Sequence, residues 1–249
     1  MKTMKAFVGR GALAGLIGGV FGAIFLWLVT EKQIRAALVI EAAGSTAGGH
    51  NEMFSRTTQV LGGMLATVLY GLFIGVIFGV VCAMLWARLP VLSTFTRSIR
   101  LAALGFVGWV LIPALKYPAN PPSVGDSATV GQRTSSFLAL LATSLFLMFA
   151  VWSLCRWLTE RGMEGARRFG IVVGVYSFII GLLYALLPGS GDDSSAIPAD
   201  LLWHFRLDSI GGQLLLWTTM GTAFGWLATR AESADRPLAT AATVPSRVH

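Results

Sequence analysis

Six stretches of apolar residues that contain no Asp, Glu, Lys, Arg or His constrain the fold of this chain more than any other feature. An α-helix needs about 20 mainly apolar residues to cross the hydrocarbon core of a bilayer, which is about 30 Å thick. The stretches cover residues 11–29, 60–87, 101–115, 136–154, 169–187 and 209–229. They predict an all-α fold, a polytopic transmembrane helix bundle of about six spans.

The composition favours a membrane protein over a soluble one. Of the 249 residues, 55% are hydrophobic and 12% are charged, whereas about 25% of an ordinary soluble domain is charged. The two Cys residues lack CxxC spacing, which excludes a disulfide framework and the common thiolate metal sites. We expect one integral membrane domain over residues 1–230 and a disordered cytoplasmic tail over residues 231–249.

The first and third stretches need separate interpretation. The first follows Lys2, Lys5 and Arg10 as a secretory signal would, but it is longer than a signal h-region and continues into a polar segment. It therefore predicts an uncleaved span. The third is short and contains Pro113, where we expect a kink or an early end of the helix.

The basic residues are distributed unequally between alternate loops. Most of the 19 lie before the first stretch, in the second and fourth loops and in the tail, and cytoplasmic loops are enriched in Lys and Arg. Both termini are therefore predicted to be cytoplasmic. Because topology accounts for the net charge of +7, nucleic-acid binding is disfavoured.

Most of the acidic residues fall on the opposite, outer side. Acidic residues have little influence on orientation, so this asymmetry is separate from that of the basic ones. It indicates an outer face that attracts cations; the alternative is that these are ordinary polar loops. The outer acidic residues are Glu31, Glu41, Glu52, Asp126, Asp192, Asp193, Asp200 and Asp208.

Two outer segments are predicted to be helical. The first helix has no breaking residue until Gly44, and Glu31 with Arg35 forms an i,i+4 pair along it. Pro198 can start a short helix whose apolar residues lie on one side, with Trp203 as an interfacial anchor.

Glycines recur at four-residue spacing in several of the stretches. Such small faces let helices in a membrane approach closely. The tandem at Gly71, Gly75 and Gly79 favours a tightly packed bundle over a dimer interface. The other pairs are Gly15/Gly19, Gly18/Gly22, Gly170/Gly174 and Gly221/Gly225.

The middle of each stretch lacks Asp, Glu, Lys, Arg and His, although proton relays and many cation-coupled carriers use such residues. An ion that crosses would meet neutral oxygens instead. The chain also has no GxSxG, HExxH or phosphate-loop motif, so we expect no enzymatic activity. The intramembrane polar residues are Tyr70, Thr143, Ser144, Tyr176, Gln213, Thr218, Thr219 and Thr222.

Candidate metal ligands occur only on the outer side. His50 and Glu52 are two residues apart in a loop, and His204 and Asp208 have the i,i+4 spacing of one helix face. Nitrogen and oxygen donors suit Co, Ni, Zn or Mn. The alternative is that these histidines are simply solvated.

A proline-rich string, LKYPANPPSVGD, follows the third stretch at residues 115–126. Each proline fixes its own φ and restricts the residue before it. The string is therefore predicted to be a rigid strap that presents Lys116, Asn120 and Asp126 on the outer face. The alternative is a proline-rich turn without a chemical role.

The chain resembles the CbtA family of predicted cobalt transporter subunits. The resemblance rests on LKYPANPPSVGD, on a His-containing segment ahead of Arg56 and Gln59, and on FRLDS at residues 205–209 with Gln213, Trp217 and Gly221-xxx-Gly225 after it. It implies an integral membrane protein that imports cobalt for cobalamin synthesis beside a small single-span, His-bearing partner, CbtB.

We therefore expect a subunit of the bacterial inner membrane that helps carry Co²⁺ inward as its transported ion, with no tightly bound cofactor. The metal ligands would be His50, Glu52, His204 and Asp208, and the protein would contact lipid, not nucleic acid, with an oligomer left open. The alternative is a non-transporting scaffold or assembly subunit. The predicted substrate entrance consists of Lys116, Tyr117, Asn120, Asp126, Arg56 and Arg206.

Overall fold

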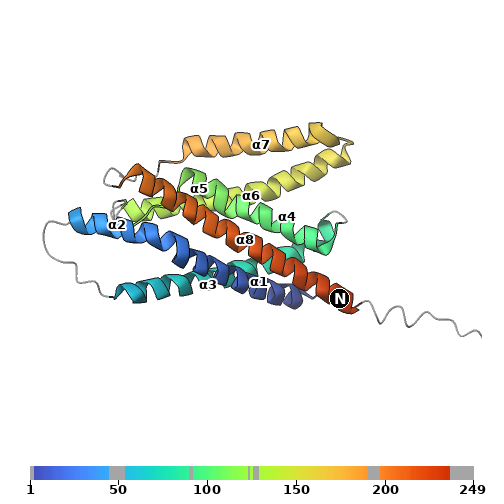
Figure 1. Ribbon diagram of the computed structural model, residues 1–249. Coiled ribbons are helices and arrows are strands. Elements are labelled where there is room, and N and C mark those ends of the chain that lie inside the picture. The colour runs from blue at the N-terminus through green and yellow to red at the C-terminus, as the bar shows by residue number, and fades with distance from the viewer. Residues whose placement is uncertain are drawn as a thin grey trace, which may run out of the picture. The chain divides into compact units, whose positions relative to one another are not determined.

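The computed structural model describes residues 3–44, 54–89, 92–122, 124–125, 129–189 and 197–235, and this part of the chain forms helices and connecting turns without a β-strand (Figure 1). The helices are α1 (Met4–Phe25), η1 (Leu26–Thr30), α2 (Glu31–Gly44), α3 (Arg56–Leu85), η2 (Trp86–Arg88), α4 (Thr94–Phe106), η3 (Val107–Leu111), α5 (Ile112–Lys116), α6 (Val130–Glu160), α7 (Gly165–Leu186) and α8 (Ala199–Asp235). The elements η1 and η3 are π-helical turns, and η2 is a 3₁₀ turn.

Five helical segments are long and apolar enough to cross a membrane. Four of them contain the whole of one predicted stretch, and the fifth contains its stretch except for the last residue. The all-helical membrane fold is therefore confirmed for the first five stretches. The five segments are Met4–Ala43, Arg56–Arg88, Thr94–Lys116, Val130–Glu160 and Gly165–Leu186. The sixth stretch, 209–229, lies inside α8, which is 37 residues long but is not among the five. A sixth crossing stays a prediction.

The prediction of a short separate helix after Pro198 is wrong. Pro198 precedes the helix, and the Leu202 amide donates to its carbonyl at 3.1 Å. From Ala199 the chain continues as α8 through Asp235 without interruption. No proline occurs along this run to break it. The helix includes residues 231–235, which the sequence assigned to the tail; residues 236–249 lie outside the described part.

The third span differs from its prediction at both ends. Ser93 accepts a hydrogen bond from the Thr96 amide, and this cap lets the helix begin at Thr94. Pro113 does not end the helix, which continues to Lys116. A proline ring clashes with the carbonyl four residues earlier in a regular α-helix, and here the widened π-turn η3 occupies that position.

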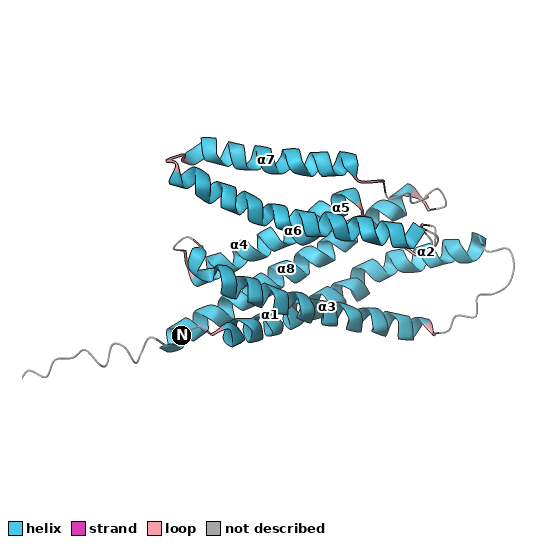
Figure 2. Ribbon diagram, turned by 180° about the vertical axis from the view of Figure 1, so that it is seen from behind, coloured by secondary structure: helices cyan, strands magenta, loops and turns pink. Residues whose placement is uncertain are grey.

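The chain divides into two compact units, of which the first comprises Met1–Leu28, Asn51–Leu104 and Gly212–His249. Within it α1 and α3 lie side by side along glycine faces (Figures 1 and 2). A Cβ atom added at Gly75 would lie 2.3 Å from the Gly11 carbonyl oxygen, and one at Gly15 would lie 2.2 Å from that of Gly71. The predicted close packing is confirmed for this pair of helices.

The C-terminal part of α8 completes the first unit. Gly18 faces Leu216, and the Ser98 hydroxyl donates to the Gly221 carbonyl at 2.6 Å, so α8 contacts both α1 and α4. An aromatic cluster closes this packing. Its members are Phe7, Phe78, Trp86 and Phe224, whose ring centroids lie 5.3 to 6.1 Å apart in the contacting pairs.

The second unit comprises Val29–His50 and Gly105–Gly211. Its apolar core joins Ile112, Leu147 and Ile180, from α5, α6 and α7. The buried Ser144 hydroxyl donates to the Gly108 carbonyl at 2.9 Å, which ties α6 to the π-turn η3. At Gly170 and Gly174 of α7, an added Cβ would meet no atom within 4 Å, so this glycine pair packs against no described helix.

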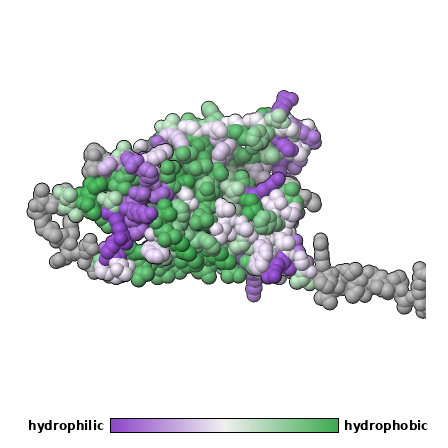
Figure 3. All heavy atoms as spheres, viewed as in Figure 1, coloured by the Kyte–Doolittle hydropathy of each residue, from purple (hydrophilic) through white to green (hydrophobic). Residues whose placement is uncertain are grey.

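Large apolar side chains remain on the surface. Phe169, Phe178 and Leu186 of α7 are each about 70% exposed. Hydrophobic residues cover much of the visible surface, with hydrophilic ones toward helix ends (Figure 3). Soluble monomers do not expose contiguous apolar surface on this scale, whereas lipid would cover it.

Candidate functional site

The described part of the strap, residues 116–122 and 124–125, is held to the end of α7 by its first two residues. The Lys116 ammonium group donates to the Tyr184 carbonyl, and the Tyr117 hydroxyl donates to the Pro188 carbonyl, both at 2.8 Å. Tyr184 in turn donates its hydroxyl to the Ile112 carbonyl of α5. These contacts fix the direction in which the strap leaves the helix.

The middle of the strap is bound to α8. Arg206 donates from Nη2 to the side-chain oxygen of Asn120 at 2.9 Å. Further along, Gly125 has φ of +104°, and an added Cβ would lie 2.1 Å from Nη1 of Arg133, so a glycine is required there. The strap is thus held at its start by the end of α7 and in its middle by α8, and its Gly125 lies against the Arg133 side chain of α6.

The structure places His204 with an acidic residue other than the predicted one. Its Nδ1 atom lies 2.8 Å from the Asp200 carbonyl and 3.2 Å from the Asp200 carboxylate, and both side chains are exposed. A helical side chain tilts toward the N-terminus, so His204 reaches back one turn. Asp208, the partner that the sequence predicted for His204, has one buried carboxylate oxygen without a hydrogen bond in the described residues.

Three predicted site residues, His50, Glu52 and Asp126, lie outside the described residues. Within the described ranges, no group of three or more His, Cys, Asp or Glu side chains could hold a metal ion. The metal-capture prediction therefore stays a prediction.

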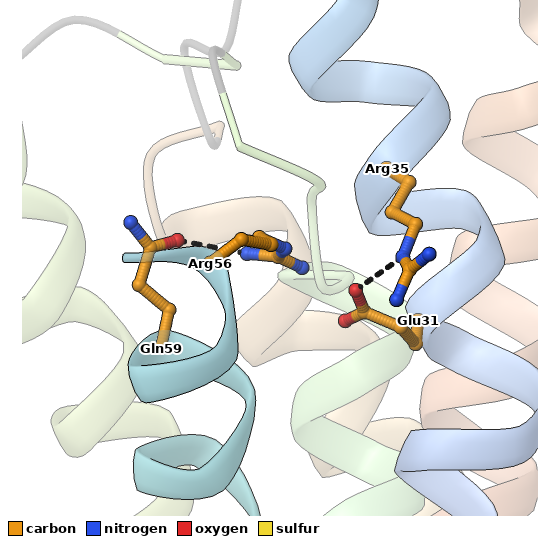
Figure 4. Close-up of polar contacts among 4 residues, drawn as sticks. All are labelled: Glu31, Arg35, Arg56 and Gln59. Atoms are coloured by element: carbon orange, nitrogen blue, oxygen red, sulfur yellow. Dashed lines mark hydrogen bonds and ion pairs between the residues drawn. The ribbon is translucent and has the colours of Figure 1, made fainter. Parts of the chain in front are cut away.

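Arg56 lies in the first turn of α3, in the first unit. Ser55 caps this helix by accepting from the Thr58 amide, and Arg56 donates to the Gln59 side chain at 2.9 Å (Figure 4). Gln59 also donates to the Phe54 carbonyl at 3.1 Å. Arg56 is thus positioned by its own helix end, whereas the other described entrance residues belong to the second unit.

Glu31 is a buried carboxylate that the sequence did not reveal. Its predicted partner is confirmed, because Arg35 donates from Nε to Oε1 of Glu31 at 2.8 Å (Figure 4). Glu31 is only 4% exposed, and it is the one charged residue among the buried residues of the described chain. The sequence predicted the helix and the pair with Arg35, but it gave no indication that Glu31 is buried.

Long apolar helices with exposed apolar side chains define this protein as a multi-pass membrane protein of the helical-bundle class. A family model described as "Probable cobalt transporter subunit (CbtA)" matches residues 4–229. The chain therefore belongs to the CbtA family. Neither the curated proteins nor the solved structures contained a match.

Proposed function

We propose that this protein is the multi-pass subunit of a Co²⁺ uptake transporter in the bacterial cytoplasmic membrane, and that the cobalt serves cobalamin synthesis. The observation that carries the proposal is the family match over residues 4–229, together with the five apolar helices. The charge asymmetry of the loops supports cytoplasmic termini.

In this proposal, capture occurs on the outer face. His50 and Glu52, which lie between α2 and α3 in the sequence, supply an imidazole and a carboxylate for the hydrated ion, and His204 and Asp208 supply a second pair. Asp126 belongs to the same entrance. The cation then leaves its water for oxygen ligands along the route.

The fixed strap supports a defined entrance. Its contacts with Tyr184, Pro188 and Arg206 keep Lys116, Tyr117 and Asn120 in set positions. Arg56 would contribute from the start of α3. A fixed rim favours selection at the entrance because it adds little ordering cost when an ion arrives.

A second subunit would supply further ligands. The family description names a subunit, which implies a partner. We propose a small, single-span, His-bearing protein of the CbtB type, since the described residues alone hold no cluster of metal-ligating side chains. The pair would work without a tightly bound cofactor and without catalysis.

The direct test is ⁵⁷Co²⁺ uptake by cells whose only cobalt importer is this chain with its partner. We expect the variant His50→Ala with Glu52→Ala to lower uptake at sub-saturating cobalt by at least about tenfold, because even groups that only support metal ligands change affinity about 10- to 100-fold. The control is Glu160→Gln, an exposed carboxylate on α6. Uptake equal to that of the wild type in the capture variant would refute the capture role.

A non-transporting scaffold is the second candidate. The lack of a metal-ligating cluster in the described ranges favours it. Reconstitution separates the two functions: cobalt flux into liposomes that contain this chain alone excludes a pure scaffold. Full flux with the partner alone would support the scaffold and contradict transport by this chain.

A further inference from the structure

The turn between α6 and α7 concentrates arginine residues. Residues 156–168 contain four Arg and two Glu but no Lys, which gives the turn a net charge of +2. Membrane topology explains why a loop is basic, but it does not require the basic side chains to be held in place. Here they are held by specific contacts. The four basic residues are Arg156, Arg161, Arg167 and Arg168.

A glycine cap and a hydrogen bond between the two helices hold this turn in place. Gly162 has φ of +75°, and its amide donates to the Thr159 carbonyl at 3.0 Å. The Met163 amide donates to the Leu158 carbonyl, also at 3.0 Å. This pair of bonds is the Schellman motif, which ends α6 here. Across the turn, Arg168 of α7 donates from Nη1 to the Thr159 hydroxyl at 2.7 Å. The basic residues of the two helix ends therefore stay close together.

Two of the arginines lie against tryptophan rings of α6. The Cζ atom of Arg161 is 3.7 Å from the centre of the Trp157 ring. The Cζ atom of Arg156 is 5.7 Å from the centre of the Trp152 ring. Tryptophan is typical of the membrane–water interface, so these rings indicate the depth of the lipid headgroups. A guanidinium group that stacks on a ring keeps its N–H groups along its edge, where they can still donate hydrogen bonds.

Most of the positive charge of the turn has no carboxylate partner. Arg156 forms an ion pair with Glu160, with 3.7 Å between nitrogen and oxygen. Within the described part of the chain, Arg161, Arg167 and Arg168 form no ion pair. Arg161 and Arg167 are also exposed. Their charge is thus available to a ligand outside the protein, and a guanidinium group matches phosphate oxygens with two parallel hydrogen bonds.

The adjoining surface of α7 is apolar and exposed. Of the described residues of α7, only Ile180 is buried, and Phe169 and Phe178 are each about 70% exposed. Phe169 directly follows Arg168, so the lipid-facing surface begins where the basic turn ends. The two helices form a hairpin with this turn at one end (Figures 1 and 2). A basic turn at the interface, next to lipid-facing helix surface, favours a lipid headgroup as its ligand.

We propose that the α6–α7 turn binds the headgroup of an anionic phospholipid, whose phosphate accepts hydrogen bonds from Arg161 and Arg167. Arg168 braces the turn. Because the turn has an excess of positive charge, it selects a lipid of net negative charge over a zwitterionic one, whose ammonium group it repels. Lys116 and Tyr117 hold the opposite end of α7, so a bound lipid would hold the end that the strap does not reach. The proposal does not depend on cobalt transport.

The test is the affinity of the purified full-length chain for phosphatidylglycerol and for phosphatidylcholine, measured by native mass spectrometry in an uncharged detergent. The wild type should bind the first phosphatidylglycerol at least about tenfold more tightly than phosphatidylcholine, because two basic side chains near an anionic lipid contribute about fivefold each. The double variant Arg161→Gln with Arg167→Gln should bind phosphatidylglycerol at least about tenfold more weakly than the wild type. Its affinity for phosphatidylcholine should not change.

The matched control is Arg88→Gln with Arg100→Gln. It removes the same charge from two exposed arginines of the first unit, and it should bind phosphatidylglycerol as the wild type does. An equal loss of affinity in both double variants would indicate a diffuse effect of net charge and would overturn the proposal. A wild type that does not prefer phosphatidylglycerol would also overturn it.

Two further measurements address the source of the phosphate and the folding of the variant. An excess of inorganic phosphate, at constant ionic strength, should not displace phosphatidylglycerol; displacement would show that the turn takes free phosphate and would contradict a lipid site. If the double variant does not fold, Arg167→Gln decides alone, because Arg167 is exposed and forms no side-chain hydrogen bond or ion pair within the described residues. An affinity about two- to fivefold weaker supports the proposal, and an unchanged affinity contradicts it.

Discussion

At the residue scale, the glycines of α1 and α3 are required for close approach of the two backbones. An added Cβ atom at Gly11, Gly15, Gly71 or Gly75 would lie 2.2 to 2.5 Å from the nearest backbone atom of the opposite helix. Backbone cannot move aside as a flexible side chain can. Association of helices in lipid depends on such packing, since there is no hydrophobic drive between them.

Gly75→Ala should therefore destabilise the protein by about 1–3 kcal/mol or more, the range for overpacking a filled core. Thermal unfolding in detergent, followed by size-exclusion chromatography, measures this effect. Gly62→Ala is the matched control in the same helix, because an added Cβ there meets nothing within 4 Å. It should leave stability unchanged or slightly raised, and an equal loss in both variants would contradict the packing argument.

A glycine is also needed at position 125 of the strap. Its φ of +104° is strained for any residue with a Cβ, and the Arg133 guanidinium occupies the space that the Cβ would take. A sequence reveals that a glycine follows a run of prolines. It does not reveal which later side chain covers that glycine, because the contact depends on how α6 packs.

At the element scale, the first five spans were predictable because a long apolar stretch without charge has few alternatives to a membrane helix. The helix ends were not, because capping by Ser55 and Ser93 extends two helices over polar residues that hydropathy excludes. The two π-turns have no compositional signature. For that reason, the continuation of the helix past Pro113 could not be foreseen.

The π-turn η3 is held by a buried hydroxyl of α6. Ser144 is fully buried and donates to the Gly108 carbonyl at 2.9 Å. Ser144→Ala should cost about 1 kcal/mol, the typical net value of a hydrogen bond, as measured by thermal unfolding. Ser153→Ala is the control, because Ser153 is exposed and bonds only within its own helix at 3.0 Å. Equal stability of the two variants would show that the turn does not depend on Ser144.

The candidate site was predictable in part. The strap was recognisable from its prolines, and the structure shows it fixed by Lys116, Tyr117 and Asn120. Its anchor at Tyr184 carried no sequence signal, since a tyrosine near the end of an apolar helix is common at membrane interfaces. His204 was predicted to face Asp208, but both i+4 and i−4 neighbours share its face, and spacing alone does not choose between them.

At the scale of the whole molecule, the side of the membrane on which each loop lies depends on α8. Five crossings put the termini on opposite sides, whereas a sixth crossing by α8 puts them on the same side. The helix is 37 residues long, well above the roughly 20 needed to span a bilayer. Its polar residues, such as Gln213, lower its hydropathy, but Gln213 is partly buried and lies 3.5 Å from the Tyr70 hydroxyl. A partnered amide in a bundle is tolerated within a membrane.

We therefore expect both termini in the cytoplasm, as the basic loops indicate. Reporter fusions test this: green fluorescent protein should fluoresce, and alkaline phosphatase should be inactive, when fused after residue 235 or before residue 4. A fusion after residue 189 should show the reverse, since that loop would be external. Active alkaline phosphatase at the C-terminal site as well as after residue 189, with an inactive N-terminal fusion, would mean five crossings. His204 and Asp208 would then begin a helix that does not cross, and capture by them would need a different route into the bundle.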